Sequence, residues 1–236
     1  MKFINPKISI IIPVLNNLKG LQKTIDSIKA QTFRDYEVWI IDGNSSMPIH
    51  AYLDTLEAPF FYLSEKDQGI YDAMNKGISL AKGEWLYFLG ASDLLDNENV
   101  LGVVAKKLNI NLDILYGNIR YDKIKFTSRF SSLLWIKNSL HHQSVFYNKK
   151  LFTKIKYEIT YKVLADYDFN LNLYSKNIKA EKIDAMIANC DKDGVSKDYN
   201  WSLYKAELKL KKAYLNSAFY PLLLLLVAFK FTVRKL

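Results

Sequence analysis

The chain has 236 residues, of which 50% are hydrophobic and 24% are charged, so it is long enough for one large core and too apolar for a disordered protein. Its formal net charge of +9 favours phosphates, anionic lipid or nucleic acid as partners. The single cysteine, Cys190, excludes an internal disulfide and fits a reducing cytoplasm.

The first part of the chain alternates predicted strands and helices. Short, mostly apolar runs predict buried strands at residues 8–14, 36–41, 60–63 and 85–89. Apolar residues at helical spacing predict one helix that ends near Ala30 and a second one between Gly69 and Gly83. This alternation indicates an α/β protein with a doubly wound, mostly parallel sheet and helices on both of its faces.

The pattern changes after Asp93. A helix is expected near residues 97–108 and another at about 163–174, and short mixed or antiparallel strands are expected at 114–116, 119–121, 123–127 and 144–147. No linker or repeat interrupts this order. We therefore expect one domain at residues 1–197, made of an N-terminal half (1–95) and a C-terminal half (96–197), with a helical tail at 198–236.

The tail combines a short apolar run with basic residues. Residues 218–229 contain no charge, and as a helix they would reach roughly 18 Å at ~1.5 Å per residue, against about 30 Å of membrane hydrocarbon. The basic residues flanking this run are Lys211, Lys212, Lys230, Arg234 and Lys235. This combination predicts a tail that lies on an anionic membrane surface and does not bind nucleic acid. A core helix or an oligomer contact is the alternative.

Three loops follow the predicted parallel strands, at residues 13–16, 42–46 and 90–93. Ligands of open α/β sheets bind outside the carboxyl ends of such strands. The Asp42 carboxylate is placed to accept hydrogen bonds from a nucleobase or a ribose. Asp93 is placed to bind a divalent cation that bridges diphosphate oxygens. A turn or helix-capping aspartate is the alternative at both positions.

Taken together, these segments resemble the family 2 glycosyltransferases, which have the GT-A fold, over roughly residues 8–196. The similar motifs are the opening strand at 9–16, the turn at 40–46 and the segment at 64–78. The resemblance implies an N-terminal half that binds a nucleotide-sugar donor and a C-terminal half that binds the acceptor. The residues that it places at the donor are Pro13, Val14, Asn16, Asp42, Asp67, Asn75, Lys76, Ser92, Asp93 and His142.

The metal motif departs from the family pattern. The family usually has Asp-x-Asp or Asp-Asp at this strand end, whereas this chain has Ala91, Ser92 and Asp93. Only the last carboxylate is retained, and it is the one that touches the metal directly in the family. The resemblance therefore implies Mg²⁺ or Mn²⁺ held by Asp93 together with substrate phosphates.

The segment from Leu164 to Phe169 resembles the family's acidic motif at the start of a helix, where an aspartate acts as general base. Asp166 matches that position. Asp168 lies two residues further on and therefore points away from the face of Asp166. Two first-turn carboxylates favoured by the helix dipole are the alternative. His142, before Gln143, resembles a His-Gln pair of the family, and a structural histidine is its alternative.

The resemblance implies an inverting hexosyl- or N-acetylhexosaminyltransferase that moves a sugar, preferably from a UDP-sugar, to an acceptor hydroxyl. With the basic tail, it suggests a lipid-linked glycan acceptor in cell-surface polysaccharide synthesis, and a cytoplasmic enzyme on the inner face of the membrane. Residues 193–196 resemble a loop that closes over the donor. The rivals are a non-catalytic sugar-nucleotide-binding or scaffold protein and a nucleotidyltransferase, which normally needs a glycine-rich loop after its first strand. Oligomers are compatible with the sequence.

Overall fold

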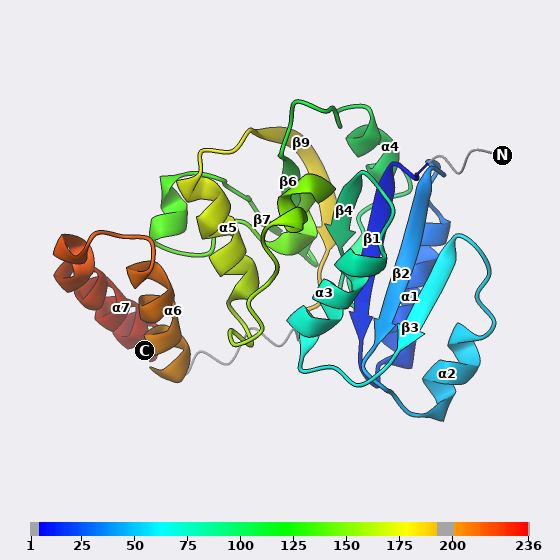
Figure 1. Ribbon diagram of the computed structural model, residues 1–236, viewed down its shortest axis with the longest axis horizontal. Helices are drawn as coiled ribbons and strands as arrows, with labels where there is room; N and C mark the ends of the chain where they lie inside the picture. The colour runs from blue at the N-terminus through cyan, green and yellow to red at the C-terminus, as the bar shows by residue number, and fades with distance from the viewer. Residues whose placement is uncertain (1–4, 193–200, 236) are drawn as a thin grey trace.

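The computed structural model describes residues 5–192 and 201–235. Within them one sheet organises the fold, with the strand order β3-β2-β1-β4-β8-β6-β9-β5 and with β7 paired to β6 (Figure 1). The expected loop at 193–196 and the first residues of the expected tail lie outside the described residues. The α/β class expected from the alternating pattern is confirmed.

Four parallel strands form the N-terminal half. They are β1 (Ile8–Val14), β2 (Tyr36–Asp42), β3 (Phe60–Ser64) and β4 (Trp85–Phe88). The helices that connect them are α1 (Leu18–Lys29), α2 (Met47–Leu53) and α3 (Ile70–Leu80). Because the strands are parallel, their carboxyl ends meet at one edge, where Val14 is level with Asp42 and Asp42 with Ser64.

Helices cover both faces of this parallel half, as the buried β-branched strands predict. On one face Ile10 and Ile12 pack with Leu21 of α1, and on the other face Ile11 packs with Met74 of α3. Figure 1 shows α3 in front of these strands and α1 behind them. Burial on both faces explains why these strands are continuous apolar runs.

The second half is a mixed sheet. Its strands are β5 (Leu94–Leu95), β6 (Ile114–Tyr121), β7 (Ile124–Phe126), β8 (Val145–Asn148) and β9 (Ala180–Asn189). Its helices are α4 (Val100–Ala105) and α5 (Ala165–Ser175), with the 3₁₀ turns η1 (Ser132–Trp135), η2 (His142–Ser144) and η3 (Lys149–Thr153). β8 runs antiparallel to β4 and joins the two halves.

This half differs from the expectations in three respects. The strands expected at 114–116 and 119–121 are one strand, β6, because the sheet continues through an irregular register near Asn118. A further strand, β9, was not expected at all, although it pairs with β6 in parallel. The helix expected at 97–108 is shorter and spans Val100–Ala105.

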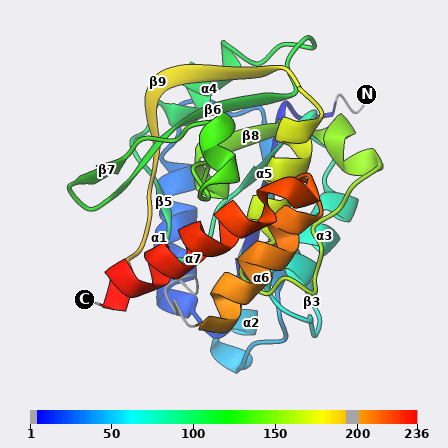
Figure 2. The same cartoon turned by 90° about the vertical axis from the view of Figure 1, so that its left-hand side faces the viewer.

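The tail forms α6 (Trp201–Lys212), η5 (Ser217–Phe219) and α7 (Tyr220–Lys235). These helices lie at one end of the molecule in Figure 1, and Figure 2, which looks onto that end, shows α6 and α7 side by side. Val227 of α7 packs against Tyr204 and Leu208 of α6. None of the helices in the described residues is long and apolar enough to cross a membrane.

The membrane interpretation requires the basic residues of the tail to face solvent, but not all of them do. Lys211 is completely buried, and its ammonium donates to the Ile136 carbonyl at 2.8 Å and to Glu207. Burial lowers the pKa of Lys211 to about 8, although the negative charge of Glu207 acts to raise it. Lys230 also bonds Glu207, at 2.8 Å. Lys211 and Lys230 therefore fix the tail to the main domain. The expectation that Lys211 meets lipid headgroups is wrong, because it is buried, whereas membrane contact of the tail as a whole stays a prediction.

Candidate active site

The turn η2 brings two carboxylates from distant parts of the chain to one place. Nδ1 of His142 lies 3.2 Å from Oδ2 of Asp166, at the start of α5. The next side chain, Gln143, donates from Nε2 to Oδ2 of Asp93 at 3.1 Å, in the loop after β4. Because the two bridging residues are consecutive, Asp93 and Asp166 flank one site at the junction of the two halves.

Four donors surround the Asp166 carboxylate, which is 5% exposed. Oδ1 accepts from the Tyr71 hydroxyl at 3.1 Å and from the Tyr167 N–H at 2.7 Å, and Oδ2 accepts from Asn138 at 3.4 Å. Burial opposes ionisation, but the hydrogen bond and charge of His142 outweigh it and hold the pKa of Asp166 below its ordinary value. The carboxylate is therefore charged and oriented at neutral pH.

Asp168 occupies the same first turn of α5 but faces elsewhere. Its Oδ1 accepts from the Tyr214 hydroxyl at 2.8 Å, on the side of the tail. Burial raises the pKa of Asp168, although the bond from Tyr214 opposes this rise. The spacing argument, which places the two carboxylates on different faces of the helix, agrees with these partners.

Asp93 is a buried carboxylate, 7% exposed, whose partners are neutral. The N–H groups of Gly90 and Asp191 donate to it at 3.2 Å and 2.9 Å, in addition to Gln143. No lysine or arginine within the described residues forms an ion pair with it. Burial raises the pKa of Asp93 above its ordinary value, although the surrounding N–H donors and the nearby His142 oppose this rise.

The carboxylate oxygens of Asp93 suit a cation that takes its remaining ligands from substrate oxygens. Within the described residues, no group of three or more histidine, cysteine, aspartate or glutamate side chains could hold a metal ion by itself. A buried anion without a cationic partner is nevertheless costly, and a divalent cation would compensate its charge. Next to it, Oε1 of Gln143 is buried without a hydrogen-bond partner in the structure. Both observations indicate an interaction with a ligand that the protein alone does not supply.

Asp67 lies at the edge formed by β1 and β2. Its Oδ1 accepts from the Gly69 N–H at 2.9 Å, while its Oδ2 is so close to Gly43 that a Cβ there would lie 2.7 Å from it. Leu15 borders the same glycine and is 58% exposed. Asn16 ties the neighbouring loops together, because its Oδ1 accepts from Ser46 at 3.0 Å. Leu15 and Asp67 therefore both lie close to Gly43 at this edge.

Asp42, by contrast, is a buried turn residue. It is 0% exposed, and its carboxylate accepts from the Ser45 N–H at 3.1 Å and from the Ser64 hydroxyl at 2.6 Å. The alternative of a turn aspartate therefore describes Asp42 better than a direct donor contact. Pro13 and Val14 are buried too, and the Val14 carbonyl accepts from Gly43, so their side chains face the core.

Asn75 and Lys76, which were expected near the donor, bind the protein itself. The Asn75 amide makes two bonds to the backbone of Tyr157, at 2.9 Å and 3.0 Å. Lys76 pairs with Glu65 at 2.9 Å and donates to the Lys66 carbonyl at 2.8 Å. Lys76 thus supports the loop that carries Asp67 and is not a free cation for a phosphate.

Ser92 is held in an unusual backbone conformation beside Asp93. Its φ is 101°, in a region that side-chain-bearing residues rarely adopt. Its hydroxyl accepts from Asn17 at 3.0 Å, and its N–H donates to Thr24 at 3.0 Å. Gly20 allows this approach, because a Cβ on Gly20 would lie 2.2 Å from the Ser92 hydroxyl oxygen.

Replacement of Gly20 by alanine should therefore push aside the Ser92 hydroxyl and the Asn17 side chain that caps α1. Loss of such a cap costs ~0.5–2 kcal/mol, so the free energy of unfolding should fall. Gly102→Ala in α4 is the matched control, because the nearest atom to a Cβ there is at 3.8 Å. Urea denaturation of both variants measures the difference. Equal stability of the two variants would contradict the role given to Gly20.

Comparison with known proteins places this architecture in a family. The model of the family described as glycosyl transferase family 2 matches residues 9–181. The chain belongs to this family. It is 37% identical over 180 residues to the PGL/p-HBAD biosynthesis glycosyltransferase of Mycobacterium bovis, which covers 72% of this chain and 70% of the relative. The protein is thus a glycosyltransferase, and its membership of the family expected from the motifs is confirmed.

Other similar proteins agree. The glycosyltransferase is 31% identical over 123 residues to the GalNAc(5)-diNAcBac-PP-undecaprenol beta-1,3-glucosyltransferase of Campylobacter jejuni, covering 50% of this chain and 40% of that protein. S. aureus TarS 1–349 in complex with UDP-GlcNAc has a TM-score of 0.72 at 16% identity, over 92% of this chain and 70% of that one. The mannosyltransferase PcManGT from Pyrobaculum calidifontis, in complex with GDP-Man and Mn²⁺, has a TM-score of 0.63 at 15% identity, covering 94% and 69% of the two chains. These structures share the GT-A fold with the glycosyltransferase.

Proposed function

We propose that this glycosyltransferase inverts the anomeric configuration while it moves a sugar from a nucleotide-diphosphate donor, preferably a UDP-sugar, to an acceptor hydroxyl. The observation that carries the proposal is the bridge of His142 and Gln143 between Asp166 and Asp93. It sets a charged, oriented carboxylate next to a second carboxylate that lacks a cation. Such a pair can act on both sides of one anomeric carbon.

In this reaction Asp166 acts as general base. The acceptor oxygen forms a bond to the anomeric carbon while its proton passes to Oδ2 of Asp166, and the bond to the diphosphate oxygen breaks with its electron pair on the leaving group. The contact of Asn138 with Oδ2 is the longest at this carboxylate, 3.4 Å, so the acceptor hydroxyl would take its place. His142 holds the other contact and keeps the carboxylate in position.

The donor would lie between Asp67, at the edge formed by β1 and β2, and Asp93. Leu15 and Asp67 would contact the base, and the diphosphate would reach Asp93. Bound at Asp93, Mg²⁺ or Mn²⁺ would neutralise the charge that develops on the departing diphosphate. Solved relatives of the same fold with UDP-GlcNAc and with GDP-Man and Mn²⁺ support a sugar-nucleotide donor of this class.

The acceptor that we propose is a lipid-linked glycan in bacterial surface-polysaccharide synthesis. A relative that acts on a diphosphoundecaprenol-linked glycan, by its name, supports this class. The proposed location is the anionic inner face of the membrane, approached by the tail through exposed Leu222 and Leu225 and not through Lys211.

The test is a screen of UDP-, GDP- and dTDP-sugars for slow hydrolysis and transfer, with and without EDTA, in which NMR records the anomer released. Metal-dependent hydrolysis of a UDP-sugar that yields the inverted anomer is expected. Release of the retained anomer would reject Asp166 as a base in a single displacement. Absence of hydrolysis with every donor would favour the non-catalytic alternative.

The pH dependence should follow Asp93. As the pH falls, Asp93 takes up a proton before Asp166, because burial raises the pKa of Asp93 above its ordinary value while the hydrogen bond and charge of His142 hold that of Asp166 below its ordinary value. Proton and metal compete for Asp93, so kcat/KM for the donor should decline on the acid side, and this decline should move to lower pH as Mn²⁺ is raised. A decline of kcat/KM at acid pH that does not shift with the Mn²⁺ concentration would contradict this assignment.

A further inference from the structure

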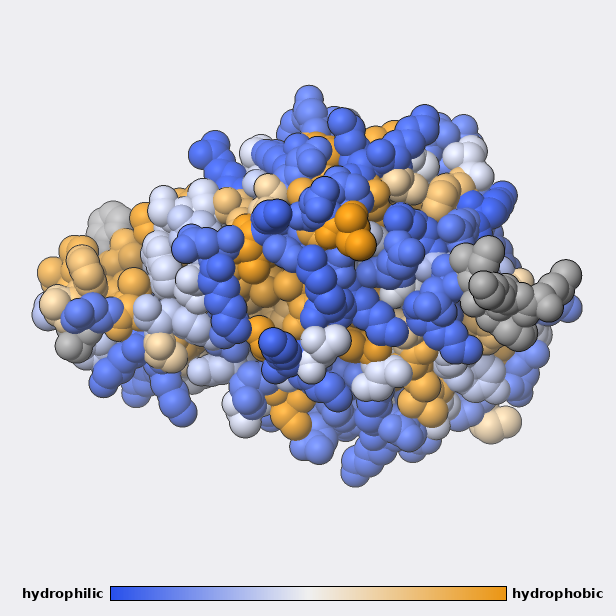
Figure 3. Space-filling view, turned by 45° about the horizontal axis from the view of Figure 1, so that its top comes forward, coloured by the Kyte–Doolittle hydropathy of each residue, from blue (hydrophilic) through white to orange (hydrophobic). Residues whose placement is uncertain are grey.

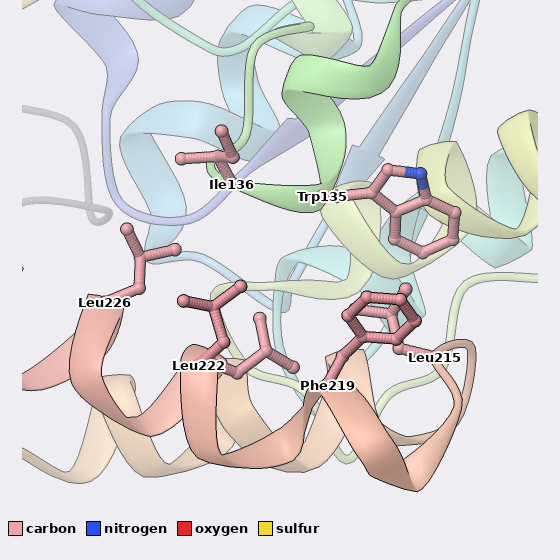
Figure 4. A pocket seen from close by; sticks show the side chains of 7 residues that line it. Trp135, Ile136, Leu215, Phe219, Leu222 and Leu226 are labelled. Atoms are coloured by element: carbon pink, nitrogen blue, oxygen red, sulfur yellow. The ribbon is translucent and has the colours of Figure 1, made fainter.

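Two pockets are lined in part by the segment that follows β7 and contains η1. The first is an apolar pocket of about 560 Å³ between this segment and the tail. It is lined by Trp135, Ile136, Leu215, Phe219, Leu222 and Leu226, which face one another across it in Figure 4. Figure 3 shows hydrophobic side chains gathered at this end of the molecule. Phe219 and Leu222 are 54% and 65% exposed, so the pocket opens to the surface.

The second is a basic pocket of about 370 Å³, to which Lys125, Arg129 and Lys137 contribute the cations. Thr127 and Ser139 add hydroxyl groups to its lining. Within the described residues, none of the three cations forms an ion pair with a carboxylate. Three unneutralised cations at one polar pocket favour a phosphate or a similar anion, which can balance their mutual repulsion.

The two pockets share one short wall. Ile136 lines the apolar pocket and Lys137 the basic one, and consecutive Cα atoms are only about 3.8 Å apart. This wall is fixed to the tail, because Lys211 and Lys230 both donate to the Ile136 carbonyl. One amphiphilic molecule can therefore place a charged head and a hydrocarbon chain in the two pockets at once.

The residues next to this wall also contact Asp166, the candidate base. Asn138, next to Lys137, donates to Oδ2 of Asp166 at 3.4 Å, and the Leu134 carbonyl accepts a hydrogen bond from Tyr167. A head group held by Lys137 would thus lie close to the carboxylate that removes the acceptor proton. An acceptor with few sugars between its phosphate and its reacting hydroxyl suits this spacing.

We infer that the acceptor is a short glycan on a lipid phosphate, whose phosphate binds Lys125, Arg129 and Lys137 while its hydrocarbon chain lies between Trp135 and Leu222. This inference rests on the proposed function and names the acceptor site that the reaction requires. Its charge complementarity with the basic pocket and the apolar lining next to it favour this single occupant over a second copy of the chain. A protein interface of stable size would need a much larger contact, about 800 Å² per partner.

Calorimetry in EDTA, with dodecyl phosphate below its micelle concentration, tests the inference against dodecanol and inorganic phosphate. Dodecyl phosphate should bind at least about tenfold more tightly than either, because only it fills both pockets. The triple variant Lys125→Ala, Arg129→Ala, Lys137→Ala should lose about tenfold in affinity, and so should Leu222→Asp. The matched control replaces the exposed Lys106, Lys107 and Lys156 by alanine and should bind as the wild type does.

Three results would overturn the inference. One is binding of dodecyl phosphate no tighter than that of inorganic phosphate or dodecanol, and another is equal affinity of the triple variant and its control. The third is a loss seen with phosphatidylglycerol vesicles but not with dodecyl phosphate, which would assign these residues to general membrane contact. Absence of donor hydrolysis in the wild type would reject the proposed function without affecting the lipid-phosphate result.

Discussion

Replacement of Asp166 by asparagine should lower the rate of sugar transfer by roughly 10² to 10⁴-fold, the usual contribution of a general base. Asparagine has the same shape, and its oxygen can still accept from Tyr71 and from the Tyr167 N–H, so the first turn of α5 should remain folded. The amide has no basic oxygen to take the acceptor proton. Turnover measured with the preferred donor, and donor affinity measured by calorimetry, separate the chemical step from binding.

The matched control is Asp168→Asn, which removes the same charge from the same helical turn. Asp168 bonds Tyr214 on the side of the tail, so this variant should keep nearly full activity. Donor affinity should be similar in both variants and the wild type. An Asp166→Asn enzyme with wild-type turnover, or an equal loss in both variants, would show that Asp166 is a structural residue of the turn.

Replacement of Asp93 by asparagine should weaken metal-dependent donor binding by at least about tenfold, because changes around a metal site commonly cost 10- to 100-fold in metal affinity. The asparagine oxygen can still accept from Gly90 and Gln143, which limits the structural disturbance. Removal of the charge should also abolish the effect of EDTA on donor affinity. Titration of the donor with and without Mn²⁺ measures both changes.

Asp96→Asn serves as the control for this variant. Asp96 lies three residues away and pairs with Arg120 at 2.6 Å, outside the bridge between the two carboxylates. Its replacement should leave the response to Mn²⁺ unchanged. If Asp93→Asn binds the donor with the same Mn²⁺ dependence as the Asp96→Asn control, the proposed metal role of Asp93 is wrong.

The parts of the fold that could be predicted from the sequence are those that local pattern alone determines. β1, β2 and β4 are buried on both faces, so they are mostly apolar runs, as is typical of a covered strand. β9 carries Glu181, Lys182 and Asp184 among its residues, and its pairing with β6 depends on contacts far away in the chain. Such a strand has no local apolar signature, because tertiary pairing creates it.

The candidate site divides in the same way. Family-like motifs pointed to Asp93, Asp166 and His142, which the structure brings together around η2. They also pointed to Asp42, where an aspartate followed by Gly43 predicts a ligand contact and a buried turn equally well. Only the bonds to Ser45 and Ser64 distinguish the two.

The sequence does not predict two partners of the candidate base. Tyr71 and Asn138 come from segments far from Asp166 in the chain, and although Tyr71 lies in the family-like segment at 64–78, nothing in that motif links it to Asp166. Gln143 follows His142 in the sequence, but no pattern there predicts its bond to Asp93. Polar side chains of this kind become recognisable only when the two halves of the sheet are joined through β4 and β8.

The most direct test of the shared site uses Mn²⁺ as a paramagnetic probe. The chain has three histidines, so their imidazole NMR signals can be resolved and assigned by replacement of each residue. With Mn²⁺ and UDP bound, the His142 signal should broaden strongly, because His142 lies between Asp93 and Asp166, and Asp93→Asn should abolish the broadening. A His142 signal that remains sharp in the wild type at saturating Mn²⁺ and UDP would contradict a single site that joins metal, donor and base.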